Sequence, residues 1–124
     1  MKQIQDRFMR NWDGFLGQWG IVIVFFCAAL LADAVSTIYF MQHEGADAEM
    51  HPMVCLVSRW CGPILGPLVG AFGKAAAGLI VAVYWRRIAG FIFGLTSVIS
   101  LWAAWYNLWG HRIYIPAIYS WWPF

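Results

Sequence analysis

Three apolar stretches, each about 22 residues long, constrain the fold of this chain more than any other feature. They run from residue 20 to 41, from 63 to 85 and from 88 to 109. At a rise of 1.5 Å per residue, a helix of that length crosses the roughly 30 Å of a bilayer's hydrocarbon core. None of the stretches alternates apolar and polar residues as barrel strands do, and helices satisfy their own backbone hydrogen bonds in lipid. The sequence therefore predicts an all-α membrane protein with three transmembrane helices.

The composition agrees with a membrane protein and argues against a water-soluble one. Of the 124 residues, 62% are hydrophobic and 11% are charged, whereas an average soluble domain has about 25% charged residues. The net charge of +2 is small, and the basic residues form no cluster that could bind a nucleic acid. We expect residues 1–124 to form a single membrane domain with no nucleic-acid partner.

The segments outside the three stretches also have distinct patterns. Residues 1–18 place apolar side chains at helical spacing and predict an amphipathic helix that lies in the headgroup plane. In the connection from residue 42 to 62, His51-Pro52 resembles a helix start, so Met53 to Trp60 could form a short helix at the outer interface. Residues 110–124 are rich in Trp, Tyr and Pro and predict an aromatic tail on the outer side.

The basic residues near the span ends predict the orientation of the chain. Most of them precede the first span or lie between the second and third, namely Lys2, Arg7, Arg10, Arg86 and Arg87. Only Arg59 and Arg112 fall on the opposite side. Because cytoplasmic loops carry the excess of Lys and Arg, we expect the N-terminus in the cytoplasm and the C-terminus outside.

Two ionisable residues, Asp33 and Lys74, fall inside the predicted spans. Each alone costs about 2.5–3.5 kcal/mol at the centre of a membrane, so such residues normally face a partner or a water-filled cavity. Asp33 lies about 18 Å from the inner face along its helix, and Lys74, on a helix that runs the other way, about 15–17 Å. We therefore predict that the two side chains meet.

Small and polar residues flank both of these positions. Ala29, Asp33 and Thr37 recur every four residues on the first span. On the second span a small-residue stripe surrounds the lysine, and it consists of Gly62, Gly66, Gly70, Lys74 and Gly78. Such stripes let helix backbones approach closely. The polar cluster of Asp33, Thr37 and Lys74 is interpreted either as a structural pin that fixes helix register or as a relay for protons or ions.

These motifs resemble a family of small bacterial integral membrane proteins of unknown function, whose pattern is Asp-x3-Thr, then Glu-x-Asn-Pro, then Lys. The matching residues are Asp33, Thr37, Glu49, His51, Pro52 and Lys74, within about residues 25 to 80. His51 stands where the family has Asn, which would cap the following helix better. The resemblance implies that these polar residues act as one unit in a bacterial inner membrane, and it implies no activity.

The outer connection offers a candidate metal site. His43, Glu49 and His51 could hold a divalent cation, with Asp33 as a weaker candidate, although their spacing matches no tight metal signature. A solvated loop with local helix caps is the simpler interpretation. Cys55 and Cys61 are six residues apart in the same region, so a disulfide would require the short helix to bend.

A stripe of large aromatic residues lies near the end of the third span. Trp102, Trp105 and Trp109 are three and seven residues apart and share one helix face. An interfacial belt needs only the outermost of them, so the stripe could pack on a neighbouring subunit, a lipid or a flat hydrophobic cofactor. No nucleophile–base pair, phosphate loop or carboxylate dyad stands in a convincing context, so the sequence does not favour an enzyme.

The leading hypothesis is a small accessory or scaffold protein that acts by helix packing in a homo-oligomer or larger membrane complex. Gly66, Gly70 and the tryptophan stripe are its candidate contacts with partners or bound lipid. One rival is a transporter with an ion or proton path lined by Asp33 and Lys74. The other is a metal-binding membrane protein that uses the loop from His43 to His51.

Overall fold

The computed structural model describes residues 1–44 and 52–110. Within these residues the chain is helical and contains no strand, in the order α1 (Lys2–Trp12), α2 (Phe15–Glu44), α3 (Pro52–Tyr84), a 3-10 turn η2 (Arg86–Ile88), α4 (Ala89–Trp105) and a π-helical turn η3 (Tyr106–Gly110). Three of these helical segments are long and apolar enough to cross a membrane. The prediction of an all-α protein with three membrane-length helices is therefore confirmed.

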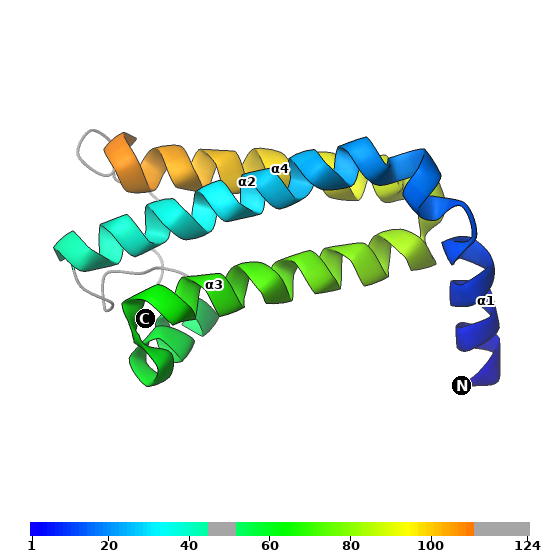
Figure 1. Cartoon of the computed structure of the whole chain (residues 1–124), viewed down its shortest axis with the longest axis horizontal. Coiled ribbons are helices and arrows are strands. Elements are labelled where there is room, and N and C mark those ends of the chain that lie inside the picture. The colour runs from blue at the N-terminus through cyan, green and yellow to red at the C-terminus, as the bar shows by residue number, and fades with distance from the viewer. Residues whose placement is uncertain (45–51, 111–124) are drawn as a thin grey trace, which may run out of the picture.

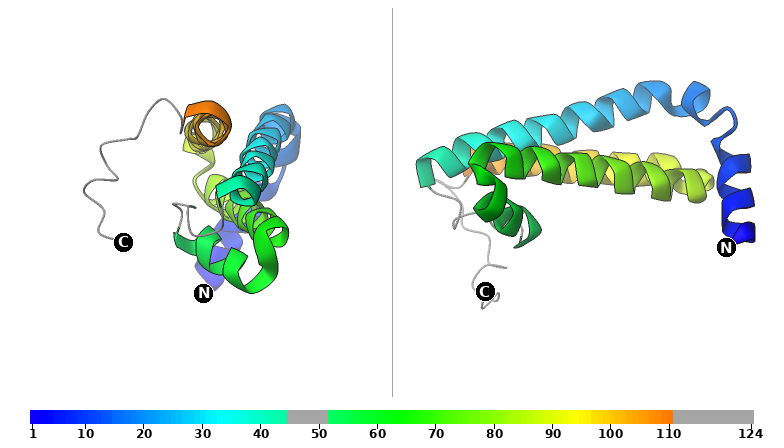
Figure 2. Two further views of the ribbon diagram at one scale, coloured as in Figure 1. Left: turned by 90° about the vertical axis from the view of Figure 1, so that its left-hand side faces the viewer. Right: turned by 60° about the horizontal axis from the view of Figure 1, so that its bottom comes forward.

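The three long helices run side by side, and α1 lies across one end of them (Figures 1 and 2). The central element is α2, which packs against both α4 and α3 more extensively than those two pack against each other. Accordingly α2 is the most buried of the three long helices and α3 the least. The weakly covered α3 leaves apolar surface that lipid or another protein chain must contact.

The helix predicted for residues 1–18 is shorter in the structure. It ends at Trp12, because Asp13 adopts an extended conformation and Gly14 has a φ of 67°. This left-handed conformation suits glycine, which has no Cβ to clash with the backbone. Phe15 and Leu16 therefore belong to α2, and the Phe15 side chain is fully buried. The sequence pattern ran across the turn because both helices place apolar residues at similar spacing.

The bounds of the long helices also differ from the predicted spans. The first runs over Phe15–Glu44 rather than 20–41, since a helix can continue past the residues that lie in hydrocarbon. The predicted end at Trp85 is one residue too long for α3, and the predicted span 88–109 is divided between α4 and the π-helical turn. Residues 111–124, which include most of the predicted aromatic tail, lie outside the described residues.

A sharp kink divides α3 at Gly62, whose φ of 92° and ψ of 167° are not helical. The segment before the kink, residues 52–61, folds back against the segment after it. A Cβ built on Gly66 would collide with Ser58, and one built on Gly70 would lie 3.0 Å from Val54. The short helix and the predicted span are thus two arms of one element that meet at this glycine.

The fold-back changes the interpretation of the glycine stripe. Gly66 and Gly70 were predicted to contact a partner or lipid, but they lie against residues 52–61 of the same chain. Farther along the stripe, Gly78 gives room to Phe26 of α2, whose ring atom Cζ would be 2.8 Å from a Cβ built there. The stripe therefore makes two intramolecular contacts, one at each end, and a contact of Gly66 and Gly70 with a partner or lipid stays a prediction.

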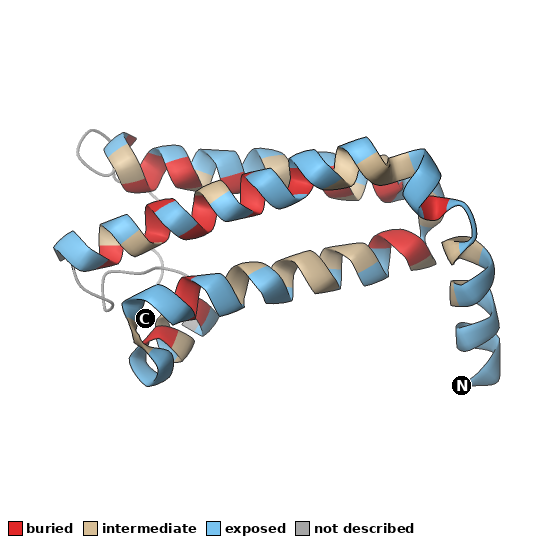
Figure 3. Cartoon of the chain, in the orientation of Figure 1, coloured by how far each residue is buried: buried red, intermediate tan, exposed pale blue. Residues whose placement is uncertain are grey.

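The apolar core fills the half of the bundle that is nearer α1. Its large members are Phe15, Phe26 and Phe93, each no more than 1% exposed. The rings of Phe26 and Phe93 lie 5.0 Å apart between centroids, a favourable tilted arrangement. Buried residues follow the facing sides of α2 and α4 along the bundle, as Figure 3 shows. Aromatic packing thus closes this end of the structure.

The kink at Gly62 makes a testable prediction. Its φ and ψ fall in a region that is essentially restricted to glycine, where another residue costs about 1–3 kcal/mol. We expect Gly62→Ala to lower the free energy of unfolding by about that amount in micelles, followed by tryptophan fluorescence.

The matched control is Gly73→Ala in the helical part of α3. No described atom outside the helix backbone lies within 4 Å of a Cβ built at Gly73, and alanine favours a helix by about 0.5–1 kcal/mol over glycine. Equal stability of the two alanine variants would contradict a strained backbone at Gly62.

Candidate functional site

The two charged residues in the middle of the bundle form an ion pair between α2 and α3. Lys74 Nζ lies 3.0 Å from Asp33 Oδ2, so the contact predicted from their depths is present. The Asp33 side chain is 12% exposed and the Lys74 side chain 35%. The carboxylate is thus enclosed by the bundle, whereas part of the lysine side chain reaches its surface. Pairing offsets part of the cost of placing each charge in hydrocarbon.

A second set of hydrogen bonds begins at the backbone of Asp33 and reaches η3 at the end of the third span. The hydroxyls of Ser36 and Thr37 each donate to the Asp33 carbonyl oxygen at 2.8 Å. Asn107 Nδ2 then donates to Ser36 Oγ at 3.3 Å and to Thr37 Oγ1 at 3.0 Å. Asp33 is therefore joined to α3 through its carboxylate and to the end of the third span through its carbonyl. All three membrane-length helices share one polar cluster, made of Asp33, Ser36, Thr37, Lys74 and Asn107.

The π-helical turn explains how Asn107 reaches this cluster. Regular α-helix ends at Trp105, and the wider turn from Tyr106 to Gly110 buries both Tyr106 and Asn107. In such a turn, residues five apart become neighbours. Consistent with this, the Trp105 ring lies where a Cβ on Gly110 would be, 2.6 Å away. Sequence reasoning missed Asn107 and Ser36, although an amide inside an apolar stretch was a usable signal.

The cluster can hold helices together but does not continue along the bundle. On the side nearer α1 it is followed by the buried aromatic core of Phe26 and Phe93. Leu30, Ala82, Val83 and Ala89 are buried beside these rings. The network therefore pins the register of three helices, and a path for ions through a single chain would have to cross the aromatic core.

A second polar contact, centred on Arg86, was not predicted as a contact at all. Its guanidinium donates from Nη1 to the carbonyl oxygens of Asn11 at 3.1 Å and Asp13 at 2.7 Å. It also donates from Nε and Nη2 to Gln18 Oε1, at 3.0 and 2.8 Å. Asn11 Nδ2 in turn donates to the Tyr84 carbonyl oxygen at 3.0 Å. The turn between α3 and α4 thereby holds the junction between α1 and α2.

The predicted metal site cannot be assembled from the part of the chain that the structure describes. Glu49 and His51 lie outside residues 1–44 and 52–110. His43 is exposed, and its Nδ1 lies 2.8 Å from the Tyr39 carbonyl oxygen. No group of three potential His, Cys, Asp or Glu ligands occurs within the described ranges.

The structure describes both cysteines of the arm before Gly62 and all three tryptophans of the stripe. Cys55 and Cys61 are both free thiols in the structure. Trp102, Trp105 and Trp109 are exposed on the outside of the bundle, at 46%, 42% and 58%. The rings of Trp102 and Tyr106 stack with centroids 5.6 Å apart. The stripe therefore remains available for lipid or a partner, as expected from its spacing.

The ion pair gives the most direct prediction of the site. Lys74→Met alone leaves Asp33 charged without its partner, so we expect a loss of about 2.5–3.5 kcal/mol in the free energy of unfolding in micelles. The double variant Asp33→Asn with Lys74→Met should lose less than half as much, because neither charge remains. Lys2→Met is the control for loss of an exposed lysine and should have no effect. A loss in the double variant as large as that in Lys74→Met, or larger, would refute coupling of the two residues.

The link to the third span gives a separate prediction. Asn107→Ala removes two hydrogen bonds between helices, which average about 0.6 kcal/mol each in membrane proteins. We expect an unfolding free energy lower by about 1 kcal/mol. Thr96→Val is the control, since the Thr96 hydroxyl donates only within its own helix, to the Ile92 carbonyl oxygen at 2.8 Å. An equal effect of the two substitutions would show that Asn107 does not join the helices.

Comparisons with known proteins add no assignment to this geometry. No protein-family model, no curated protein and no solved structure matches the chain. The function must therefore be argued from the three-helix arrangement, its polar cluster and its exposed surfaces.

Proposed function

We propose that this protein is a small accessory or scaffold protein of the membrane, which acts by helix packing in a homo-oligomer or a larger complex. The observation that carries the proposal is the outward face of α4. Trp102 is 46% exposed there, although it lies about 10 Å deeper along the helix than Trp109. An indole N–H in hydrocarbon lacks the partners that it has at the interface, so a covering protein surface would stabilise it.

The tryptophans continue a longer exposed seam on α4. Its members are spaced alternately four and three residues apart and are all at least 42% exposed, namely Phe91, Leu95, Val98, Trp102 and Trp105. Alternating spacing of this kind forms the contact line of helices that pack as knobs into holes. The seam faces away from α2, whereas the buried residues Phe93, Ser100 and Ala104 occupy other positions on α4. A second copy or another subunit could pack along it.

The proposed membrane placement is the bacterial inner membrane, with the N-terminus in the cytoplasm and the C-terminus outside. It is supported by the position of Arg86 beside the junction of α1 and α2, which puts the two basic segments at the same end. In this orientation α1 lies in the inner headgroup plane, across the end of the bundle (Figure 1). The arm of residues 52–61 then lies at the outer interface, with Met53 and Trp60 exposed.

The family resemblance is part of the same proposal. Asp33, Thr37 and Lys74 are the described members of the shared pattern, and they lie in one cluster. We propose that family members use the corresponding residues to fix helix register. The carboxylate and ammonium would then be structural in each case, which suits proteins that share a pattern without a known reaction.

Transport is the rival hypothesis that the geometry favours less. The Asp33–Lys74 pair could line a path, and Lys74 does reach the bundle surface. However, Phe26 and Phe93 fill the adjacent half of the bundle, so a path would have to run between several copies. Packing requires no such additional assumption.

Cysteine cross-linking in native membranes tests the scaffold proposal. In a variant with its three cysteines replaced by alanine, Val98→Cys places a thiol in the middle of the α4 seam. Mild oxidation should link it to a second copy, or a sulfhydryl cross-linker to another subunit that mass spectrometry identifies. Leu31→Cys, similarly exposed on α2, is the control and should remain monomeric.

The two cysteine positions also define the negative result. Equal linking at Val98 and Leu31 would indicate random collision in the membrane. Monomers at both positions would indicate that α4 faces lipid alone. Either result would overturn the proposal.

A further inference from the structure

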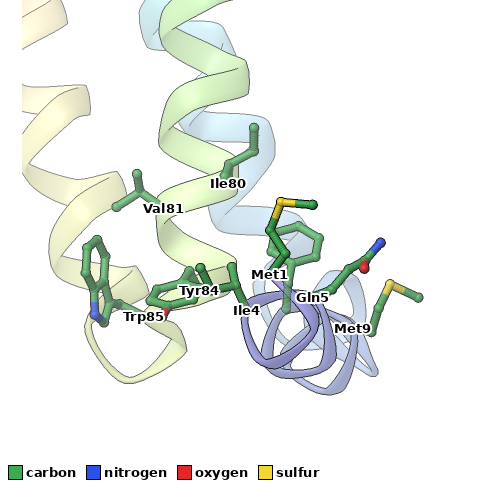
Figure 4. Close-up of a pocket in the computed structure, with 9 residues that line it drawn as sticks. Met1, Ile4, Gln5, Met9, Ile80, Val81, Tyr84 and Trp85 are labelled. Carbon is green, nitrogen blue, oxygen red and sulfur yellow. The ribbon is translucent and has the colours of Figure 1, made fainter.

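An apolar groove lies between α1 and the end of α3, and no residue of the polar cluster lines it. It is open to the surroundings, and its volume of about 580 Å³ is within the size range of small-molecule sites. Met1, Ile4 and Phe8 line it from α1, and Ile80, Val81 and Tyr84 line it from α3. Figure 4 shows the side chains of the two helices on either side of the groove.

Specific contacts fix the two walls relative to each other. The Arg7 guanidinium lies 4.5 Å from the centroid of the Tyr84 ring, a cation–π distance. The hydrogen bond from Asn11 to the Tyr84 carbonyl oxygen joins the same two helices at 3.0 Å. The groove is thus a preformed feature of the fold.

The groove continues along α3 as an open strip of small residues. Gly73, Ala77, Val81 and Tyr84 are spaced four, four and three residues apart and so share one helix face. Both Gly73 and Ala77 are exposed, and no described atom outside the helix backbone lies within 4 Å of a Cβ built at Gly73. A long apolar chain parallel to α3 could lie on this strip with its end in the groove.

The surroundings of the groove are positively charged. Lys2 and Arg7 on α1 and Arg86 and Arg87 in the turn oppose Asp6 and Asp13, a balance of four basic to two acidic residues, whereas Arg10 lies on the opposite face of α1. Lys2 and Arg7 immediately adjoin the lining residues Met1 and Phe8 in sequence. Basic groups at a membrane surface attract anionic lipid by about 1 kcal/mol each, which is about a fivefold preference.

We propose that this groove binds one anionic phospholipid of the cytoplasmic leaflet. Its acyl chain lies along α3 on Gly73 and Ala77, and its phosphate lies beside Lys2 and Arg7. This rests on the proposed placement of α1 in the inner headgroup plane. A transmembrane helix fits less well, because it is about 10–12 Å wide and α1 crosses the end of the strip.

Native mass spectrometry of the full chain tests the site, with phosphatidylglycerol and phosphatidylcholine of identical acyl chains in equal amounts. We expect the protein to retain one phosphatidylglycerol in preference to phosphatidylcholine. Val81→Trp fills the groove and should abolish this retention. Leu31→Trp, on the exposed face of α2, is the control and should keep the lipid.

A charge variant tests the headgroup contact without filling the groove. Lys2→Gln, which keeps the Arg7–Tyr84 contact between the two walls, should lower the preference for phosphatidylglycerol about fivefold. Arg10→Gln, on the side of α1 away from the lining residues, should leave it unchanged. If Val81→Trp does not fold, this comparison still decides the question.

Three results would overturn the proposal: equal retention of the two lipids by the wild type, retention of the lipid by Val81→Trp, or a protein partner lost on filling the groove. The cross-linking at Val98 probes a different helix. Failure of the lipid site and failure of the scaffold proposal are therefore distinguishable.

Discussion

The fold depends on neutralising two charges in the middle of a hydrocarbon layer. The Asp33 carboxylate can remain between the helices because Lys74 lies 3.0 Å away on α3. The same aspartate accepts hydrogen bonds from Ser36 and Thr37, and these hydroxyls accept from Asn107. Since lipid supplies no hydrogen-bonding groups, the bundle must provide all of these partners itself. Helix register is therefore fixed by polar groups, although apolar residues make up most of the surface.

Different kinds of side chain hold the helices together in the two halves of the bundle. Near α1, Phe26 and Phe93 interlock, and Gly78 provides the space that the Phe26 ring needs. Toward the other end, polar contacts replace aromatic ones, and Gly66 lets the chain fold back on Ser58. One glycine stripe thus serves two different neighbours. The glycines at its two ends are used inside the chain, whereas Gly73, next to Lys74 in sequence, is exposed.

The features that sequence reasoning predicted are those that follow from length, hydropathy and depth. The three membrane-length helices and the Asp33–Lys74 contact are of this kind, because a helix converts residue number into depth. The fold-back at Gly62 was missed, since a glycine followed by proline in the sequence does not by itself specify the non-helical φ and ψ found there. Asn107 was also missed, because the π-helical turn changes which residues share a face. Arg86 was used only to predict orientation, and its contacts join positions 73 and 75 residues apart.

The separation in sequence between Arg86 and its acceptors determines when their hydrogen bonds can form during synthesis. The Asp13 carbonyl is synthesised 73 residues before the guanidinium that it binds, an interval of several seconds at about 5–20 residues per second. Throughout that interval the junction of α1 and α2 lacks the hydrogen bonds that Arg86 donates to it. Formation of these bonds therefore belongs to a late step of biogenesis, when the final hairpin has been delivered to the bilayer.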